Sequence, residues 1–183
     1  MMHKFTILSS SILLLFLLSC LSGCSSNLEK SRSFKTIFDH YRAKNGVGAI
    51  GFPPGLLGLV LDQDDPEQVE LKGLMKELSS FSMLFVEEGS EAVELKEELS
   101  MVVTDFTGRN EFQDLFRLQS GSENMFIRIR EKDGMVQEAI LMIDSDESFA
   151  VIDLRGNIDM KHFTRLVEGG YLNDLTELSD LNL

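Results

Sequence analysis

The chain has 183 residues, of which 43% are hydrophobic and 26% charged, a length and composition typical of one folded domain. Its formal net charge of -13 argues against a nucleic-acid-binding role, because a phosphate backbone repels an acidic protein. Both cysteines, Cys20 and Cys24, lie close to the N-terminus. The body of the chain therefore has no thiol for a disulfide, a zinc ligand or nucleophilic catalysis.

The N-terminal segment has the pattern of a secretory signal. Lys4 precedes an apolar run over residues 12–18, which is too short for a transmembrane helix. The run ends in Leu21-Ser22-Gly23-Cys24, which matches the lipobox of bacterial lipoproteins, whereas Cys20 is a poorer second candidate. We therefore expect residues 1–23 to be a cleaved signal peptide. Cys24 is then the lipidation site and carries a diacylglyceryl group and an N-acyl chain.

A polar tether over residues 24–31 is expected to join this lipid to the folded domain. Two or three acyl chains hold a protein durably at a membrane, whereas one chain binds only marginally. Ser25 follows the cysteine in place of the Asp that retains some lipoproteins in the inner membrane, so we expect the outer membrane. The alternative is a plain signal peptide, or an uncleaved anchor helix, in which Cys24 has no role.

The first elements of the body follow a helix-then-strand order. A stripe of apolar residues predicts an amphipathic helix over residues 33–43, with Ser31 or Ser33 as its N-cap and Asn45-Gly46 at its end. Residues 47–52 then read as a strand that Pro53-Pro54-Gly55 stops. The apolar stripe of the helix consists of Phe34, Ile37, Phe38 and Tyr41.

The middle of the chain predicts two helices with an interior strand between them. Asp65-Pro66-Glu67 is a helix start, and the buried stripe of this helix is expected to continue to Leu78 through Leu71, Leu74 and Met75. Residues 80–86 are apolar on both faces, as in an interior strand. A third helix is expected from Ser90 until Gly108 stops it. Its apolar positions are Ala92, Leu95, Leu99, Val102, Val103 and Phe106.

Four short extended segments follow, and the turn residues between them predict an antiparallel meander. The segments are residues 114–119, 124–131, 136–143 and 148–154, separated by residues 120–122, 132–134 and 144–146. Asp159 is expected to cap a last helix that carries Phe163, Leu166 and Val167 and ends at Gly169-Gly170. We therefore expect a single α+β domain over residues 32–170, with helices on a largely antiparallel sheet, and a peripheral tail over residues 171–183.

Gly46, Gly48 and Gly51 have the G-x-G-x-x-G spacing of a dinucleotide-binding loop. In that loop the glycines lie between a strand and a helix, so that the pyrophosphate meets the helix N-terminus. Here the first glycine follows a helix and two prolines follow the third. We therefore interpret the spacing as chance, and we expect Gly48 or Gly51 to lie where a neighbouring group approaches closely.

Three further groups of polar residues are candidates for a metal, ligand or catalytic site. The acids Asp62, Asp64, Asp65 and Glu67, and those at Asp144, Asp146 and Glu147, lack the glycine and closing glutamate of an EF-hand. His40 and His162 lie beside the apolar stripes of their helices and are expected at the surface. Arg128 and Arg130 share a strand face with Phe126. We expect this basic strip to pair with nearby acids, and the alternative is that it receives an acidic ligand. We predict no metal site, cofactor site or catalytic residue.

Three segments accompany the lipobox and carry a family pattern: FDHYRAKNGVGAIGF, IRIREKDGMVQEAILMID and FAVIDLRGNIDMKHFTRL. Together they resemble the domain-of-unknown-function 4252 family of small bacterial envelope lipoproteins. In the last segment, residues 154–159 resemble the family's strand, glycine turn and capped helix. The resemblance implies an α+β lipoprotein fold and a cell-envelope location, and it assigns no catalytic residue.

The leading hypothesis is a lipid-anchored envelope domain without enzymatic activity, which binds an envelope protein or contributes to envelope homeostasis. A second hypothesis is an envelope hydrolase or small-ligand enzyme that uses carboxylates in a cleft, for which a deep pocket with two convergent acids is required. A third hypothesis is a cation-responsive module built on the acidic loops.

Overall fold

The computed structural model describes residues 31–55, 73, 75–87, 89, 92–121, 123–146 and 149–168. The expected signal peptide, the lipidation site at Cys24, the tail over residues 171–183 and most of the helix expected from Asp65 lie outside these residues. The expectations for those segments stay predictions. The segment that contains the expected meander is almost wholly described.

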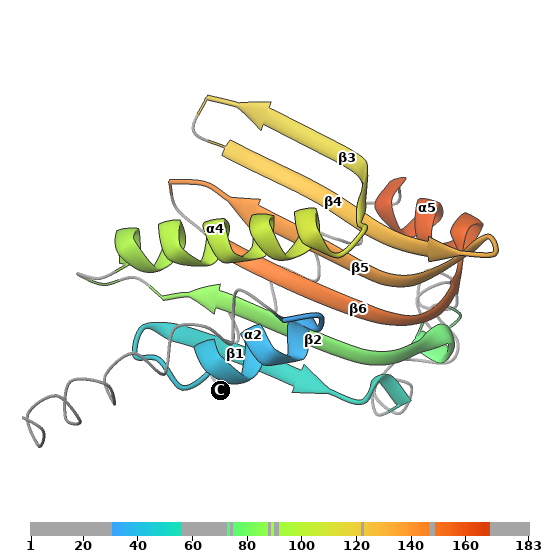
Figure 1. Ribbon diagram of the computed structural model, residues 1–183, viewed down its shortest axis with the longest axis horizontal. Helices are drawn as coiled ribbons and strands as arrows, with labels where there is room; N and C mark the ends of the chain where they lie inside the picture. Colours follow the sequence, from blue (N-terminus) through green and yellow to red (C-terminus); the bar gives the residue numbers. More distant parts are fainter. Residues whose placement is uncertain are drawn as a thin grey trace, which may run out of the picture.

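A six-stranded antiparallel sheet in the order β1-β2-β6-β5-β4-β3 forms the centre of the fold (Figure 1). The last four strands are neighbours in chain order, so the predicted meander is confirmed. The paired strands β1 and β2 join it through the pairing of β2 with β6. Together with the helices, this sheet confirms the α+β class. The strands are β1 (Val47–Phe52), β2 (Leu78–Val86), β3 (Gln113–Ser120), β4 (Glu123–Lys132), β5 (Met135–Asp144) and β6 (Phe149–Asp159).

Two apolar layers cover the two faces of the sheet. On one face pack the helices α2 (Phe34–Tyr41) and α4 (Ala92–Arg109), whose buried side chains meet Ile140, Met142 and Val151. The other face holds Leu141 and Ile152 in a second cluster, which includes Phe163 of α5 (Met160–Glu168). Alternation along β5 and β6 produces this division, because successive strand residues point to opposite faces.

The position of α2 is fixed by its N-terminal cap and by its contact with α4. The Ser33 side chain accepts a hydrogen bond from the Lys35 N–H, which confirms Ser33 as the N-cap. At the other end, the buried Tyr41 donates a hydrogen bond of 2.8 Å to Glu98 of α4. Lys44 Nζ lies 2.7 Å from both oxygens of the same carboxylate. This contact holds α2 beside α4 on the sheet.

The structure corrects three expected boundaries. Leu78 is the first residue of β2 and not part of the preceding helix. α4 continues through Gly108 to Arg109, and the left-handed residue after it is Glu111, with a φ of 60°. β6 runs through Gly156 to Asp159, so the glycine turn implied by the family resemblance is absent there. The expected Asp159 cap is confirmed by its 2.7 Å hydrogen bond from the Lys161 N–H.

The glycines of the G-x-G-x-x-G spacing serve the packing of β1. Gly46 has a φ of 78° in the turn before the strand. A Cβ added to Gly48 would lie 2.1 Å from the Phe85 ring, and one added to Gly51 would lie 3.1 Å from the Phe38 ring. The predicted close approach at Gly48 or Gly51 is therefore confirmed at both positions.

Candidate functional site

A row of polar side chains crosses the sheet on the face that α2 and α4 share. The strand register places Ser80, Arg155, Glu138 and Arg130 opposite one another on β2, β6, β5 and β4. Residues directly opposite in antiparallel strands point to the same face, so these four side chains form one row. We call these four residues the polar row.

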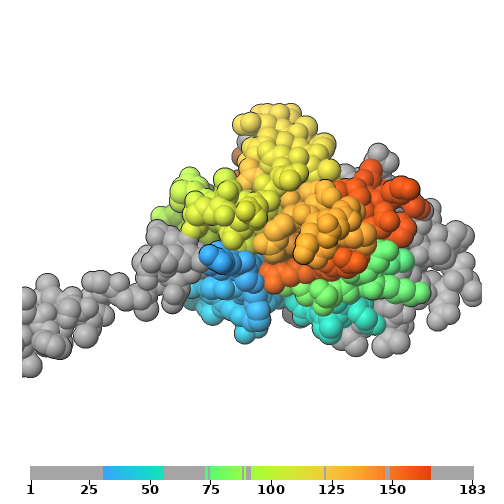
Figure 2. All heavy atoms as spheres, turned by 45° about the vertical axis from the view of Figure 1, so that its right-hand side comes forward, coloured from blue at the N-terminus to red at the C-terminus, as the bar shows by residue number. Residues whose placement is uncertain are grey.

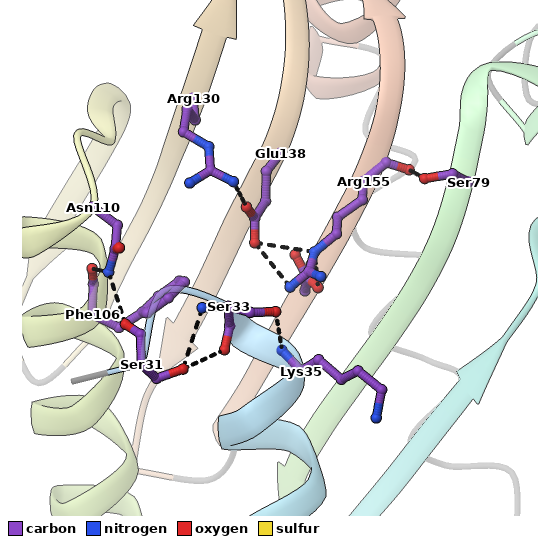
Figure 3. Close-up of polar contacts among 10 residues, drawn as sticks. Ser31, Ser33, Lys35, Ser79, Phe106, Asn110, Arg130, Glu138 and Arg155 are labelled. Carbon is purple, nitrogen blue, oxygen red and sulfur yellow. Dashed lines mark hydrogen bonds and ion pairs between the residues drawn. The ribbon is translucent and has the colours of Figure 1, made fainter. Parts of the chain in front are cut away.

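Glu138 lies at the centre of the polar row and is 1% exposed. Its Oε1 accepts a hydrogen bond of 3.1 Å from Arg155 Nε, and its Oε2 forms an ion pair with Arg130 (Figure 3). Both oxygens of this carboxylate are therefore held by guanidinium groups. A buried charge of this kind is tolerated only because its partners compensate for the lost hydration.

Asp153 occupies the next row, opposite Ser82 of β2, and is also 1% exposed. Its Oδ2 lies 3.1 Å from Arg155 Nε, whereas its Oδ1 is buried without a hydrogen-bond partner. Burial raises the pKa of Asp153 to about 8; Arg155 opposes the rise and Glu138 adds to it. At neutral pH this carboxyl group is therefore largely protonated and able to donate a hydrogen bond.

A pocket of about 360 Å³ opens between α2 and the part of the sheet that carries Asp153 and Arg155. We call it the α2 pocket. Its floor is the sheet, where Ser80, Ser82, Asp153 and Arg155 lie on the side that faces α2. Its wall is the outer surface of α2. The residues that line it are Lys35, Phe38, Asp39, Arg42, Gly51, Phe52, Pro53, Ser79, Ser80, Phe81, Ser82, Asp153 and Arg155. Its volume is within the range of small-molecule sites.

In the view of Figure 3, the residues just before α2, Ser31 and Ser33, pass in front of the strands that carry Glu138 and Arg155. Ser31 is buried, and its carbonyl accepts a hydrogen bond from Asn110 at the end of α4. Two helices thus fix the chain at this point. The chain that enters the fold at Ser31 reaches the α2 pocket at Lys35, four residues later.

The charge of this region differs in sign from that of the whole chain. Around the α2 pocket and the polar row, the cations Lys35, Arg42, Arg130 and Arg155 outnumber the three carboxyl groups of Asp39, Glu138 and Asp153. The local net charge is therefore positive even with every acid ionised, in a chain of net charge -13. Such a region attracts anions over a short range.

The predicted pairing of the basic strip is confirmed. Arg128 Nε lies 2.6 Å from Asp114 Oδ1, and its guanidinium lies 4.5 Å from the centre of the Phe126 ring. The Arg128 hydrogen bond holds the pKa of Asp114 below its usual value, although partial burial opposes this. Arg130 pairs with Glu138 as described above.

His40 and His162 lie at the surface, as expected, and the structure does not bring them together with Glu138 or Asp153. His40 makes an edge contact with the Tyr41 ring, their centres 5.0 Å apart. His162 Nδ1 lies 2.7 Å from Glu77 Oε1. Within the described ranges, no three His, Cys, Asp or Glu side chains converge as a set of metal ligands.

The structure describes only part of the two acidic loops. Asp62, Asp64, Asp65, Glu67 and Glu147 lie outside the described residues. At the turn after β5, Lys96 Nζ donates hydrogen bonds of 3.2 and 3.1 Å to the carbonyls of Ser145 and Asp146. Burial raises the pKa of Asp144, which Lys96 opposes. The amine of α4 thus contacts the carbonyl groups that the described part of this turn presents.

The edge strand β3 is exposed along its whole length. All eight of its residues are exposed, including Leu115, Phe116 and Leu118. Its hairpin with β4 projects as a ridge at the top of the space-filling view (Figure 2). One side of β3 pairs with β4, and no other strand of the described residues pairs with its other side, so β3 is the edge of this sheet.

Sequence reasoning missed Glu138 and Asp153, the two buried acids of this region. A signal was present, because each acid stands inside an apolar run, QEAILM and AVIDLR, at a position that alternation assigns to a buried face. The partners were not visible, since they depend on which strands pair and in what register. Arg155 was noted only within the expected glycine turn.

A comparison with protein-family models identifies the family of this chain. A family model described as a domain of unknown function (DUF4252) matches residues 41–166. No curated protein matches the chain. In the described ranges, no helix combines the length and hydropathy that a membrane span requires.

Proposed function

This chain belongs to the domain-of-unknown-function 4252 family, and we propose that it is a lipid-anchored cell-envelope protein that binds another envelope component and catalyses no reaction. The observation that carries the binding role is the α2 pocket, whose floor presents hydroxyl, carboxyl and guanidinium groups. In the described part of the chain, no hydrogen bond joins a pocket serine to a base, as nucleophilic catalysis requires. Glu138 is fully engaged by two arginines.

The anchor in this proposal is Cys24, in the sequence Leu21-Ser22-Gly23-Cys24. Six residues, 25–30, lie between it and Ser31, where the described chain enters the fold. The seven residue steps from Cys24 to Ser31 span at most about 25 Å when extended. The lipid would therefore hold the entrance of the fold, and the α2 pocket beside it, close to the surface of the outer membrane.

Cell fractionation of the full-length protein tests the anchor. Cys24→Ala is expected to move the protein from the membrane fraction to the soluble fraction, because the acyl chains are lost. Cys20→Ala is the matched control, and we expect it to leave the protein in the membrane fraction. Membrane association that persists in Cys24→Ala, or that is lost only in Cys20→Ala, would contradict the assignment of Cys24.

Asp153 favours a second candidate function, that of a carboxylate-dependent hydrolase. A carboxyl group whose pKa is raised to about 8 by burial stays protonated at neutral pH, the state that a general acid requires. Nitrophenyl esters and glycosides are suitable probes of such chemistry. Turnover by the wild-type protein that disappears in Asp153→Asn would replace the binding proposal with this one.

A further inference from the structure

We propose that the α2 pocket binds a small oxyanion, a carboxylate or a phosphate, on the hydroxyl groups of Ser80 and Ser82 beside the Arg155 guanidinium. The inference rests on the binding role proposed above and names the class of ligand. It follows from three features of the pocket, which are its hydrogen-bond donors, its charge and its unpartnered buried atoms.

The donors lie on one face of two paired strands. Ser80 and Ser82 are two residues apart on β2, so their side chains share a face at a spacing of about 7 Å. Arg155 and Asp153 lie directly opposite them on β6. The two hydroxyls are half-buried and make no hydrogen bond within the described structure, so both are able to donate to a ligand.

Two buried atoms at the floor of the pocket lack the partners that buried polar groups normally have. They are Asp153 Oδ1 and Arg155 Nη2. Nη2 lies 3.1 Å from Glu138 Oε1, in ion-pair range, without a directed hydrogen bond. A buried polar group left without a hydrogen-bond partner destabilises the folded state, because it has lost its hydration without replacement. An oxyanion on the adjacent serines would bring an acceptor next to the guanidinium.

The charges that face the pocket favour an anion over a cation. From α2, Lys35 and Arg42 face it together with Asp39, which pairs with both. From β6, Arg155 adds a third cation beside Asp153. Because burial keeps Asp153 protonated near neutral pH, Asp39 is then the only ionised acid among the lining residues.

The carboxylate of Glu138, which pairs with the pocket residue Arg155, does not reverse the preference of the pocket for an anion. Both of its oxygens are occupied by Arg130 and Arg155. A cation in the pocket would meet these guanidinium groups and gain no free carboxylate from Glu138. The region therefore discriminates by charge, and the serine hydroxyls supply the direct contacts.

The test is a titration of the full-length protein, purified in a non-ionic detergent, with phosphate and in a separate arm with acetate. Ionic strength is held constant with sodium chloride, so that general screening is the same at every point. Binding is followed by calorimetry and by the rise in melting temperature. A response to one anion alone identifies the source of the oxyanion, and a response to neither would overturn the proposal.

Two pairs of variants locate the binding. Ser82→Ala is expected to weaken it about tenfold, because a hydrogen bond to a charged group is lost, whereas Ser100→Ala on α4 leaves it unchanged. Arg42→Gln is expected to weaken binding about threefold, and Arg109→Gln leaves it unchanged. Arg42, at the C-terminal end of α2, and Arg109 of α4 each pair with an aspartate of the same helix. The two arginine variants therefore remove one positive charge each from similar surroundings, and only Arg42 lines the pocket. Equal effects of the two members of either pair would contradict binding at the α2 pocket.

The pH dependence supplies an independent measurement. Affinity is expected to fall as the pH rises past about 8, where Asp153 ionises and repels the anion. Asp153→Asn is expected to bind as tightly as the wild type at neutral pH and to lose this fall. A wild-type affinity that is the same on both sides of that pH would contradict the arrangement. These outcomes do not depend on Cys24, so the oxyanion proposal and the anchor proposal fail separately.

Discussion

Replacement of Asp153 by Asn is expected to change how stability depends on pH. The folded protein holds this carboxyl group with a pKa of about 8 because it is buried, whereas the ordinary pKa of an aspartate is 3.8. Between these two values the folded state retains a proton that the unfolded state has released. Raising the pH therefore favours the unfolded state, and the wild-type protein loses stability as the pH rises through this window.

The size of the effect follows from the proton count. One proton retained on folding changes the free energy of unfolding by about 1.4 kcal/mol per pH unit. From about pH 5.5 to about pH 7, the wild type is expected to lose about 2 kcal/mol relative to Asp153→Asn, which has no carboxyl group to ionise at this position. Below about pH 4 both states of the wild type are protonated at Asp153, and the penalty is absent.

Urea unfolding followed by circular dichroism at several pH values measures this difference. Asp39→Asn is the control, because the hydrogen bond from Lys35 lowers the pKa of Asp39 and confines its contribution to more acidic solutions. We expect the control to run parallel to the wild type over this range. Parallel curves for Asp153→Asn and the wild type would refute the assignment of a proton to Asp153.

Two further substitutions test the packing around the polar row. Glu138→Gln is expected to lower the free energy of unfolding by about 3 kcal/mol, since it leaves two guanidinium groups without their carboxylate, and Glu97→Gln on the exposed face of α4 is its control. Chemical denaturation measures both, and a loss no larger than that of the control would contradict the buried ion pairs. Gly156→Ala places a Cβ 2.1 Å from the Glu77 carbonyl oxygen and is expected to cost about 3 kcal/mol. Gly108→Ala meets open space on α4 and is expected to stabilise the protein by about 0.5 kcal/mol, so melting curves in which both alanines behave alike would contradict the close approach at Gly156.

The arrangement of strands was predictable because their signals are local. Turn residues between apolar segments identify the meander, and the left-handed residues Asp133 and Gly134 lie in one of these turns, between β4 and β5. The pairing of β2 with β6 had no such signal, since it joins segments that are distant in the chain. The path of β6 through Gly156 likewise depends on a distant contact, the carbonyl of Glu77.

The α2 pocket was not predictable for the same reason. Its floor combines residues of β2 and β6 that become neighbours only through the sheet register, and its wall comes from α2. The sequence reveals Asp153 and Glu138 as acids at buried positions, but it does not reveal that Arg155 lies between them. The pairing of distant strands therefore places Arg155 between the two acids and brings Asp153 into the pocket.

The mature N-terminus tests the central claim of a lipid-anchored envelope protein most directly. Mass spectrometry of the protein isolated from membranes is expected to show a chain that begins at Cys24 and carries a diacylglyceryl group and an N-acyl chain. An unmodified Cys24, or a chain that still contains residues 1–23, would contradict the account.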